Sequence, residues 1–423
     1  MGPRGSDRRR RSANVRSVKT ARNRRIYLAI SIGGNLAFEI ASVAIAWHVF
    51  TLHHRPLDLG LVGLTLFVPS FVFALPAGVV ADRRNRLRLA TFCGIVEAAA
   101  VFGLVAAVVA HVTALPAYLG ILALIGTTRA FDTPAIRSIL PSIIEAGEYV
   151  KTQAAFASLR EFVRIGGPAL GGVLVAFSVP LALATAGTLI FFSALGFGAL
   201  RMTHAARPTA PPTISDAFGG LRFIASRPIV ASAISLDLFA VLFGGATALL
   251  PAFADGIFHV GAQGLGAMRA APAVGAALVA ATIARRPIER RVGPTLLATV
   301  AIFGLATIAF AFARDFVLAL LLLAIVGGSD MVSVVIRSGL VQLATPDGMR
   351  GRVNAVENVF IGASNELGEF ESGTLAAFVG VVPAVAIGGI GTLAIIALWC
   401  AFVPALRNAD RFLEVTQAEA GAG

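Results

Sequence analysis

The chain has 423 residues, of which 57% are hydrophobic and only 14% are charged, and its mean hydropathy is +0.82. Soluble globular domains carry about 25% charged residues, so this chain has too few charges to cover a soluble surface. The composition therefore excludes a soluble globular protein and predicts an α-helical membrane protein that crosses the bilayer many times.

The net charge of +12 is concentrated at the N-terminus, where ten basic residues precede residue 26. No aromatic residue lies among them before Tyr27, although aromatic side chains usually accompany basic ones in RNA-binding surfaces. We therefore predict that residues 1–25 form a basic cytoplasmic tail, which sets topology and contacts anionic lipid headgroups. Binding to nucleic acid is not expected.

Apolar segments of about 20 residues, the length that crosses a bilayer, follow this tail. They predict twelve spans, at 26–50, 57–81, 88–111, 115–140, 153–178, 180–201, 229–252, 261–284, 294–313, 316–341, 353–379 and 382–406. A break at 201–228 begins with a proline-rich linker and separates six spans from six. Its second part starts at Ser215-Asp216, which is typical of a helix N-cap, and is predicted to be a short amphipathic helix on the inner surface.

Basic residues are concentrated in every second loop, and these loops lie on the same side of the membrane. They lie in the tail and in loops at 82–88, 201–228, 285–291, 350–352 and 407–411. Since basic loops stay cytoplasmic, both termini are expected inside the cell. The expected organisation is a tail at 1–25, a six-helix bundle at 26–201, a cytoplasmic central loop with a short amphipathic helix at 202–228, a second six-helix bundle at 229–406 and a cytoplasmic tail at 407–423.

The two halves repeat each other. Gly-Leu-Thr-Leu-Phe-Val-Pro at 63–69 aligns with Gly-Ala-Met-Arg-Ala-Ala-Pro at 266–272, and Ile-Arg-Ser at 136–138 aligns with Ile-Arg-Ser at 336–338. Two parallel six-helix repeats around a central loop are an architecture of secondary transporters, in which the substrate site lies between the halves. The expected fold is all-α, with twelve transmembrane helices in two six-helix pseudo-repeats.

The most specific motif is the loop between the second and third spans, Gly78-Val-Val-Ala-Asp82-Arg83-Arg84-Asn85-Arg86-Leu-Arg88. It resembles the loop signature of the major facilitator superfamily, with Asn85 where the family has glycine. Asparagine tolerates a left-handed turn, so this departure is mild.

The parts of this loop have separate physical roles. Gly78 allows close helix contact, and Asp82 can accept hydrogen bonds from a neighbouring helix N-terminus. Arg83 and Arg86 can pair across the seam between the halves. The resemblance implies a latch that stabilises the outward-facing state, while the alternative is a basic loop that only sets topology.

A second motif lies in the fifth predicted span, Gly167-Pro168-Ala-Leu-Gly171-Gly172. It resembles the glycine–proline signature of the drug and metabolite antiporters of that superfamily, with Val163 at the upstream glycine position. Proline within a span permits bending, and glycines permit close packing. The resemblance implies antiport, while the alternative is a packing face of small residues without that meaning.

Ionisable residues inside the bilayer are costly and are therefore usually functional. The candidates for proton coupling and for lining a substrate cavity are Glu39, Arg129, Asp132, Glu161, Arg164, Asp237, Asp330, Asn365, Glu366 and Glu369. Other ionisable residues in the predicted spans include Glu97, Arg269, Arg337, Glu357 and Glu371.

Glu39 and Asp132 are the leading coupling candidates, with Asp237 and Asp330 as their counterparts in the second half. Glu39 lies near the middle of its span, where burial favours the neutral form of a carboxylate unless an arginine lies close. Arg129 and Asp132 are three residues apart, so they share a helix face and can pair. The alternative for each residue is a permanent ion bridge between helices.

The eleventh span carries a polar cluster, in which Glu366 and Glu369 share a face and Asn365 lies nearby, while Glu371 points elsewhere. The spacing leaves three roles open for these carboxylates: attraction of a cationic substrate, transport of protons, or pairing with arginines of the fifth span.

No metal-ligand spacing, nucleophile motif or Walker loop is present, so no metal, cofactor, enzymatic activity or ATP-driven transport is expected. Cys93 and Cys400 lie in apolar runs and are interpreted as small hydrophobic residues.

At the start of the eleventh span, Arg350-Gly-Arg-Val-Asn-Ala resembles the branch of the superfamily that contains the enterobactin (siderophore) exporter. The resemblance implies a bacterial inner-membrane protein that exports a small organic molecule in exchange for protons by alternating access. Its expected partners are that substrate, protons and the lipid bilayer, and a monomer is expected. Two alternatives remain open, a facilitator or importer of a small polar metabolite and a non-transporting scaffold or receptor.

Overall fold

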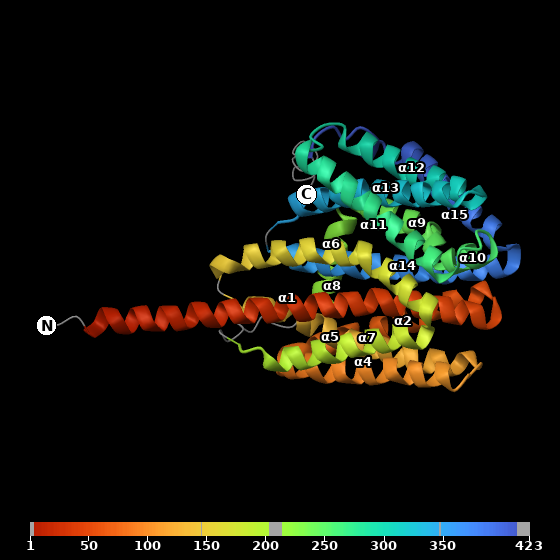
Figure 1. The fold of residues 1–423 in the computed structure, drawn as a ribbon. Helices are drawn as coiled ribbons and strands as arrows, with labels where there is room; N and C mark the ends of the chain where they lie inside the picture. The colour runs from red at the N-terminus through yellow and green to blue at the C-terminus, as the bar shows by residue number, and fades with distance from the viewer. Residues whose placement is uncertain (1–3, 145, 203–213, 347, 413–423) are drawn as a thin grey trace.

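The computed structural model describes residues 4–144, 146–202, 214–346 and 348–412, without the side chains of residues 4–20, 74–75, 82, 146, 214–218 and 405. Every regular element in these ranges is helical, in agreement with the all-α prediction. Figure 1 shows long helices lying side by side, with the start of α1 projecting beyond one end of the bundle.

The first half contains the helices before the central loop. They are α1 (Arg4–His53), α2 (Pro56–Val72), α3 (Ala74–Arg83), α4 (Arg86–Val109), α5 (Leu115–Ile143), α6 (Ala146–Phe177) and α7 (Val179–Ala199). The central loop contains α8 (Ile214–Ala225). The N-cap prediction required Ser215 and Asp216 to lie in front of the helix. Since α8 begins at Ile214, they lie in its first turn instead.

The second half follows with a 3-10 helix, η1, among its α-helices. Its elements are α9 (Pro228–Phe243), η1 (Gly245–Leu249), α10 (Leu250–Gly256), α11 (Gly261–Arg285), α12 (Val292–Phe312), α13 (Phe316–Ala344), α14 (Arg350–Val379), α15 (Val381–Phe402) and α16 (Pro404–Arg407).

Each of the twelve predicted spans overlaps one or more of these helices. Within the described residues, eight segments are long and apolar enough to cross a membrane: Ala21–His53, Arg86–Val109, Val179–Ala199, Pro228–Gly256, Gly261–Arg285, Val292–Phe312, Phe316–Ala344 and Val381–Phe402. The other four predicted spans correspond to α2 with α3, α5, α6 and α14. The last three carry several charged residues each, which lowers their hydropathy.

The second predicted span is not continuous, because it breaks at Phe73 between α2 and α3. Pro76 lacks an N–H and disfavours helical geometry just before it, and it fits the first turn of a new helix. The seventh predicted span also changes, because α9 gives way to η1 after Gly244. There, Gly245 packs against the backbone of Gly368 on α14.

The two halves show equivalent close contacts, as expected for a repeat. In the first half, a Cβ on Gly126 of α5 would stand 2.6 Å from the carbonyl oxygen of Leu66 on α2. In the second half, Gly327 of α13 approaches the carbonyl oxygen of Pro272 on α11 in the same way. By these contacts, α2 of the first half corresponds to α11 of the second half, and α5 corresponds to α13. The residue boundaries of the two bundles stay a prediction.

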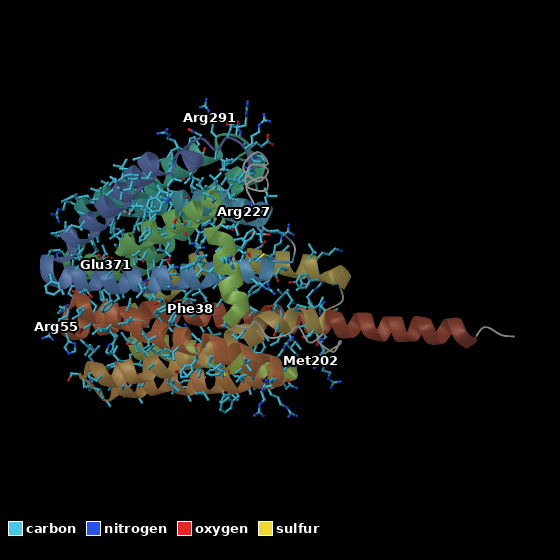
Figure 2. All side chains as sticks on the ribbon, turned by 180° about the vertical axis from the view of Figure 1, so that it is seen from behind. Phe38, Arg55, Met202, Arg227, Arg291 and Glu371 are labelled. Atoms are coloured by element: carbon cyan, nitrogen blue, oxygen red, sulfur yellow. The ribbon has the colours of Figure 1, made fainter. Side chains whose placement is uncertain are left out.

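The two ends of the bundle differ in charge and in packing. We call the end with loops 82–88, 285–291 and 350–352 the basic end and the opposite one the far end. Figure 2 shows Met202 and Arg227 toward the basic end, from which α1 projects, and Arg55 and Glu371 at the far end, with Phe38 between them.

The halves meet near the far end along two lines of contact, which we call the far-end seal. Between α2 and α14, a Cβ on Gly373 would stand 2.9 Å from the α-carbon of Gly60. Between α6 and α11, a Cβ on Gly172 would stand 2.9 Å from the α-carbon of Gly266. His54 Nδ1 and Asp255 Oδ2 add a contact across the halves at 3.5 Å. Glycines at both lines allow backbones to approach closely.

Candidate functional site

Two chambers share lining residues; the first lies between the halves, and the second is lined by the first half except for Asn358. The central chamber, about 440 Å³, is lined from both halves, with Phe38 and Ser42 from α1, Arg129 from α5, Arg269 from α11 and Glu369 from α14 among its residues. The basic-end chamber, about 590 Å³, extends toward the start of α1 and is lined by residues that include Tyr27, Asp132, Arg137 and Tyr149. Both chambers share Phe38, Arg129 and Asn358, so together they form one cavity that leads from the far-end seal toward the basic end.

Arg129 is held in the cavity wall by an ion pair with Glu97. Its Nη2 lies 2.7 Å and its Nε 2.9 Å from Glu97 Oε1, and its guanidinium lies 4.6 Å from the centroid of the Phe38 ring. The predicted pair between Arg129 and Asp132 is therefore wrong as a direct contact. Packing of α4 on α5 places Glu97 opposite Arg129, whereas Asp132 accepts a hydrogen bond from Thr133 Oγ1 at 3.2 Å.

Arg269 is the charged residue that connects the halves inside the central chamber. It lies on α11 in the second half and donates a hydrogen bond to Ser42 Oγ on α1 in the first half. Its Nε is buried without a hydrogen-bond partner. Its electrostatic neighbours are Glu39 on α1 and Glu369 on α14, so it stands between acidic groups of both halves.

Glu366 and Glu369 meet the first half at Gly63 of α2. A Cβ at Gly63 would stand 3.0 Å from Glu369 Oε2 and 3.4 Å from Glu366 Oε2. Both carboxylates line the central chamber, and no ion pair of the described side chains includes either one. We call Glu366 and Glu369 the α14 carboxylate pair. Of the three roles left open, pairing with arginines of the fifth predicted span does not occur in this structure.

Asp237 belongs to a different cluster, buried within the second half. Arg337 Nε lies 3.2 Å from Asp237 Oδ2, the same arginine pairs with Glu357, and Ser333 donates a hydrogen bond to Asp237 at 3.1 Å. Asp330 lines a cavity of only about 10 Å³ beside them. Asp237 therefore corresponds to the alternative interpretation, an ion bridge between helices, and neither aspartate lines the two chambers.

Three other candidates lie outside the chambers. Glu161 and Arg164 on α6 form an exposed ion pair at 3.7 Å. Asn365 is exposed and donates a hydrogen bond to the Ile361 carbonyl of its own helix at 2.9 Å. These residues lie on helices that line the chambers, but their side chains point away from them, because neighbouring residues on a helix point about 100° apart.

Glu39 also does not line either chamber, because its side chain packs against the glycine–proline motif of α6. A Cβ on Gly167 would stand 2.6 Å from Glu39 Cβ, and one on Gly171 would stand 3.1 Å from the α-carbon of Ile40. The motif thus contacts α1 through Gly167 and Gly171, while Pro168 and Gly172 contact Gly266 on α11. The packing role proposed as the alternative is present, and the implied antiport role stays a prediction.

The predicted latch loop lies at the basic end. Nothing lies within 4 Å of a Cβ at Gly78, so the expected close helix contact is absent in this conformation. Arg83 is exposed, Arg86 is half-buried, and the side chain of Asp82 lies outside the described part. Asn85 has φ −66°, outside the left-handed region, and caps α4 by accepting hydrogen bonds from Leu87 N and Arg88 N.

The sequence placed two residues of the cavity, Glu97 and Arg269, and the centre of the second-half cluster, Arg337, within the spans but did not assign them to a site. Glu97, Arg269 and Arg337 were recognisable as ionisable residues inside spans, which was the available signal. Their partners lie on other helices, so only the packing identifies them. Among the described residues, no group of three histidines, cysteines, aspartates or glutamates is arranged to hold a metal ion.

Comparison with known proteins agrees with this architecture. A family profile described as "Transmembrane secretion effector" matches residues 18–416. The chain is 27% identical over 387 residues to the enterobactin exporter EntS of Citrobacter koseri, covering 87% of this chain and 88% of that protein.

Solved structures support the fold. A bacterial homologue of the human lysosomal transporter Spinster, in an inward-facing and unoccupied conformation, superposes with a TM-score of 0.70 at 14% identity, covering 95% of this chain and 98% of that one. A bacterial homologue of the iron transporter ferroportin in an inward-facing state superposes with a TM-score of 0.69 at 16% identity, covering 92% of this chain and 99% of that one. The chain therefore belongs to the transmembrane secretion effector family of the major facilitator superfamily and is a multi-pass membrane transporter, not an enzyme.

Proposed function

We propose that this protein exports a small organic molecule from the bacterial cytoplasm in exchange for protons, by alternating access. The observation that carries the proposal is the charged cavity between the halves, which is sealed at the far end and extends toward the basic end. A scaffold has no need for such a cavity with costly intramembrane charges.

The direction of the proposed cycle follows from charge. Basic loops stay cytoplasmic, so the basic end faces the cytoplasm, both termini lie inside, and this conformation is open inward. Alternating access then requires the far-end seal to open while the basic end closes. We propose that the latch loop, with Asp82, Arg83 and Arg86, holds that closed basic end.

The cavity lining indicates an amphipathic substrate. Phe38, Phe67 and Phe71 supply aromatic surface in the central chamber, while Arg129, Arg269 and the α14 carboxylate pair supply charge. Ligand sites combine a mostly apolar wall with a few polar groups that orient the ligand. The EntS relatives export a compound named as enterobactin, and we propose a substrate of comparable organic character without assigning the same compound.

Proton exchange requires carboxylates that water reaches from alternate sides. Asp132 lines the basic-end chamber, and we propose that it exchanges protons with the cytoplasm. Glu39, packed at the junction of α1, α6 and α11, is proposed to respond to the same protons through Arg269, its electrostatic neighbour.

The proposal is tested in proteoliposomes that contain a pH-sensitive dye, to which siderophores, drugs and metabolites are added one at a time. Substrate-evoked proton movement opposite to substrate movement is expected. Substrate movement without protons would reject antiport and favour the facilitator of a small polar metabolite. Proton and substrate movement in the same direction would instead identify an importer.

A further inference from the structure

The α14 carboxylate pair lies where the central chamber meets the far-end seal. Gly60 of α2 packs on the backbone of Phe370, the residue after Glu369, with a Cβ-to-oxygen distance of 3.1 Å. One turn along α2, Gly63 faces both carboxylates. The carboxylates therefore occupy the seam between the halves and also line the cavity on its inner side.

Both carboxylate oxygens lie close enough to Gly63 that they are near each other. Points 3.0 and 3.4 Å from one Cβ position are at most 6.4 Å apart, and two carboxylates this close in a protein interior disfavour simultaneous ionisation. The apposed surface of α2 offers glycine and no cation. Closing the seal thus removes water from two acidic groups without supplying a counter-charge from α2.

The nearby arginines compensate for these acids only in part. Arg129 interacts electrostatically with Glu366 but is paired with Glu97 at 2.7 Å, and Arg269 interacts with Glu369 but is also bonded to Ser42 and shared with Glu39. Other charged groups on the elements packed around the pair include Asp132, Glu371, His53 with Asp58, His54 with Asp255, and Asp237 with Arg337 and Glu357. Each of these either is acidic or has its own partner.

We propose that the seal between α2 and α14 closes only over the protonated α14 carboxylate pair, so that Glu366 and Glu369 load the proton that is exchanged for substrate. This inference rests on the proposed function and assigns its proton site. With the far end open, water reaches the pair from outside, and a carboxylate takes a proton from hydronium to give a carboxylic acid and water. The neutral pair then permits α2 to close over it.

Release follows from the geometry of the closed state. The pair lines the central chamber, which continues past Arg129 to Asp132 in the basic-end chamber. Protons leave by this route, and the two restored carboxylates repel each other beneath the seal and favour its opening. Substrate that enters the same chamber reaches Glu366 and Glu369 directly and competes with the protons there.

The first test measures the seal itself and needs no substrate. Spin labels are placed on the exposed residues Arg55 and Val379, at the far ends of α2 and α14, in a chain in which Cys93 and Cys400 are replaced by alanine. Their distance distribution is measured by electron–electron resonance in nanodiscs in acidic and alkaline buffer. A short distance in acid and a longer one in alkali are expected for the parent.

The double variant Glu366→Gln/Glu369→Gln imitates the protonated pair, so the short distance is expected at both pH values. The matched control is Glu371→Gln on the same helix, whose carboxylate is bonded to Ser372 at 3.3 Å and which should behave like the parent. A parent distance that does not change with pH, or a double variant that keeps the parent's pH dependence, overturns the inference.

Gly63→Ala provides a second variant in case the double variant folds poorly. Its Cβ would press on both carboxylates, so a longer distance is expected even in acid. Gly120→Ala is its control, because nothing lies within 4 Å of that position. An unchanged distance in Gly63→Ala contradicts the proposed role of this contact.

A proteoliposome assay separates this inference from the proposed function. If the parent exchanges protons for substrate and the double variant loses proton movement while retaining substrate–substrate exchange, both stand. If the double variant keeps proton movement, the inference fails and antiport remains. If the parent itself moves substrate without protons, the proposed function fails.

Discussion

Gly172 on α6 and Gly266 on α11 face each other across the two halves, and a Cβ on Gly172 would stand 2.9 Å from the α-carbon of Gly266. The same position would lie 2.5 Å from the carbonyl oxygen of Ala262. Gly172 belongs to the glycine–proline motif of α6, which therefore holds part of the far-end seal. The motif connects a sequence pattern with the conformation that the transporter adopts.

Replacing Gly172 with alanine should weaken this seal. The added methyl group meets backbone and not a flexible side chain, and overpacking of this kind costs about 1–3 kcal/mol. We expect a lower apparent Tm in detergent and greater labelling of cysteines placed at the far end. Gly166→Ala on the same helix is the control, because its Cβ would meet open space. Equal labelling in the two variants would contradict a role of Gly172 in the seal.

The buried cluster around Arg337 should be a stability element. Arg337 is only 4% exposed and pairs with both Asp237 and Glu357, so Arg337→Ala leaves two buried carboxylates without their cation. Breaking a buried ion pair in this way costs about 3–5 kcal/mol. Both the apparent Tm for thermal unfolding and the yield of folded protein should fall. Arg314→Ala, at an exposed position, serves as the control, and a normal Tm for Arg337→Ala would rule out this structural role.

Asp132→Asn should uncouple proton movement from substrate while the protein remains inserted and folded. Asp132 is buried in the wall of the basic-end chamber, and removal of a positioned proton-transfer group lowers rates by roughly a hundredfold. The measurement is substrate-driven proton flux in proteoliposomes over a range of pH. Glu161→Gln is the control, because its exposed carboxylate lies outside the chambers. Normal pH-dependent flux in Asp132→Asn would remove this residue from the pathway.

Glu39→Gln should also impair coupling, by a different route. Glu39 does not line the chambers but lies beside Gly167 and interacts with Arg269. Loss of its negative charge should change how Arg269 is shared between the halves, and so alter the pH dependence of transport more than substrate affinity. Separate measurement of binding and of flux checks this expectation, which fails if flux keeps the parent's pH dependence.

Asn85→Ala tests the N-cap at the start of α4. Its side chain accepts two backbone hydrogen bonds as an N-cap, and loss of such a cap costs about 1 kcal/mol. The apparent Tm should fall slightly while transport persists. Asn85→Gly should be milder, since glycine is tolerated at this position. A loss of transport with unchanged Tm would point instead to a direct part in the latch.

The sequence by itself determined the membrane class, the positions of the helices and the family. Apolar segments interrupted by basic loops specify spans because the bilayer accepts only long apolar helices. The loop motif at 78–88 pointed to the superfamily because its residues are consecutive in the chain, so their spacing can be recognised without the tertiary structure. Even the break at Phe73 had a local cause in Pro76, although the hydropathy pattern concealed it.

The tertiary structure alone decided which charges meet. Arg129 pairs with Glu97 on a neighbouring helix and not with Asp132 on its own helix. Asp237 pairs with Arg337 away from the candidate cavity, and Arg269 forms a hydrogen bond that connects the halves. The physical reason is that a helix period specifies which face a residue occupies, but not which helix lies opposite that face. The partner depends on how glycines such as Gly63 and Gly172 allow the halves to approach, and that contact is a property of the folded chain.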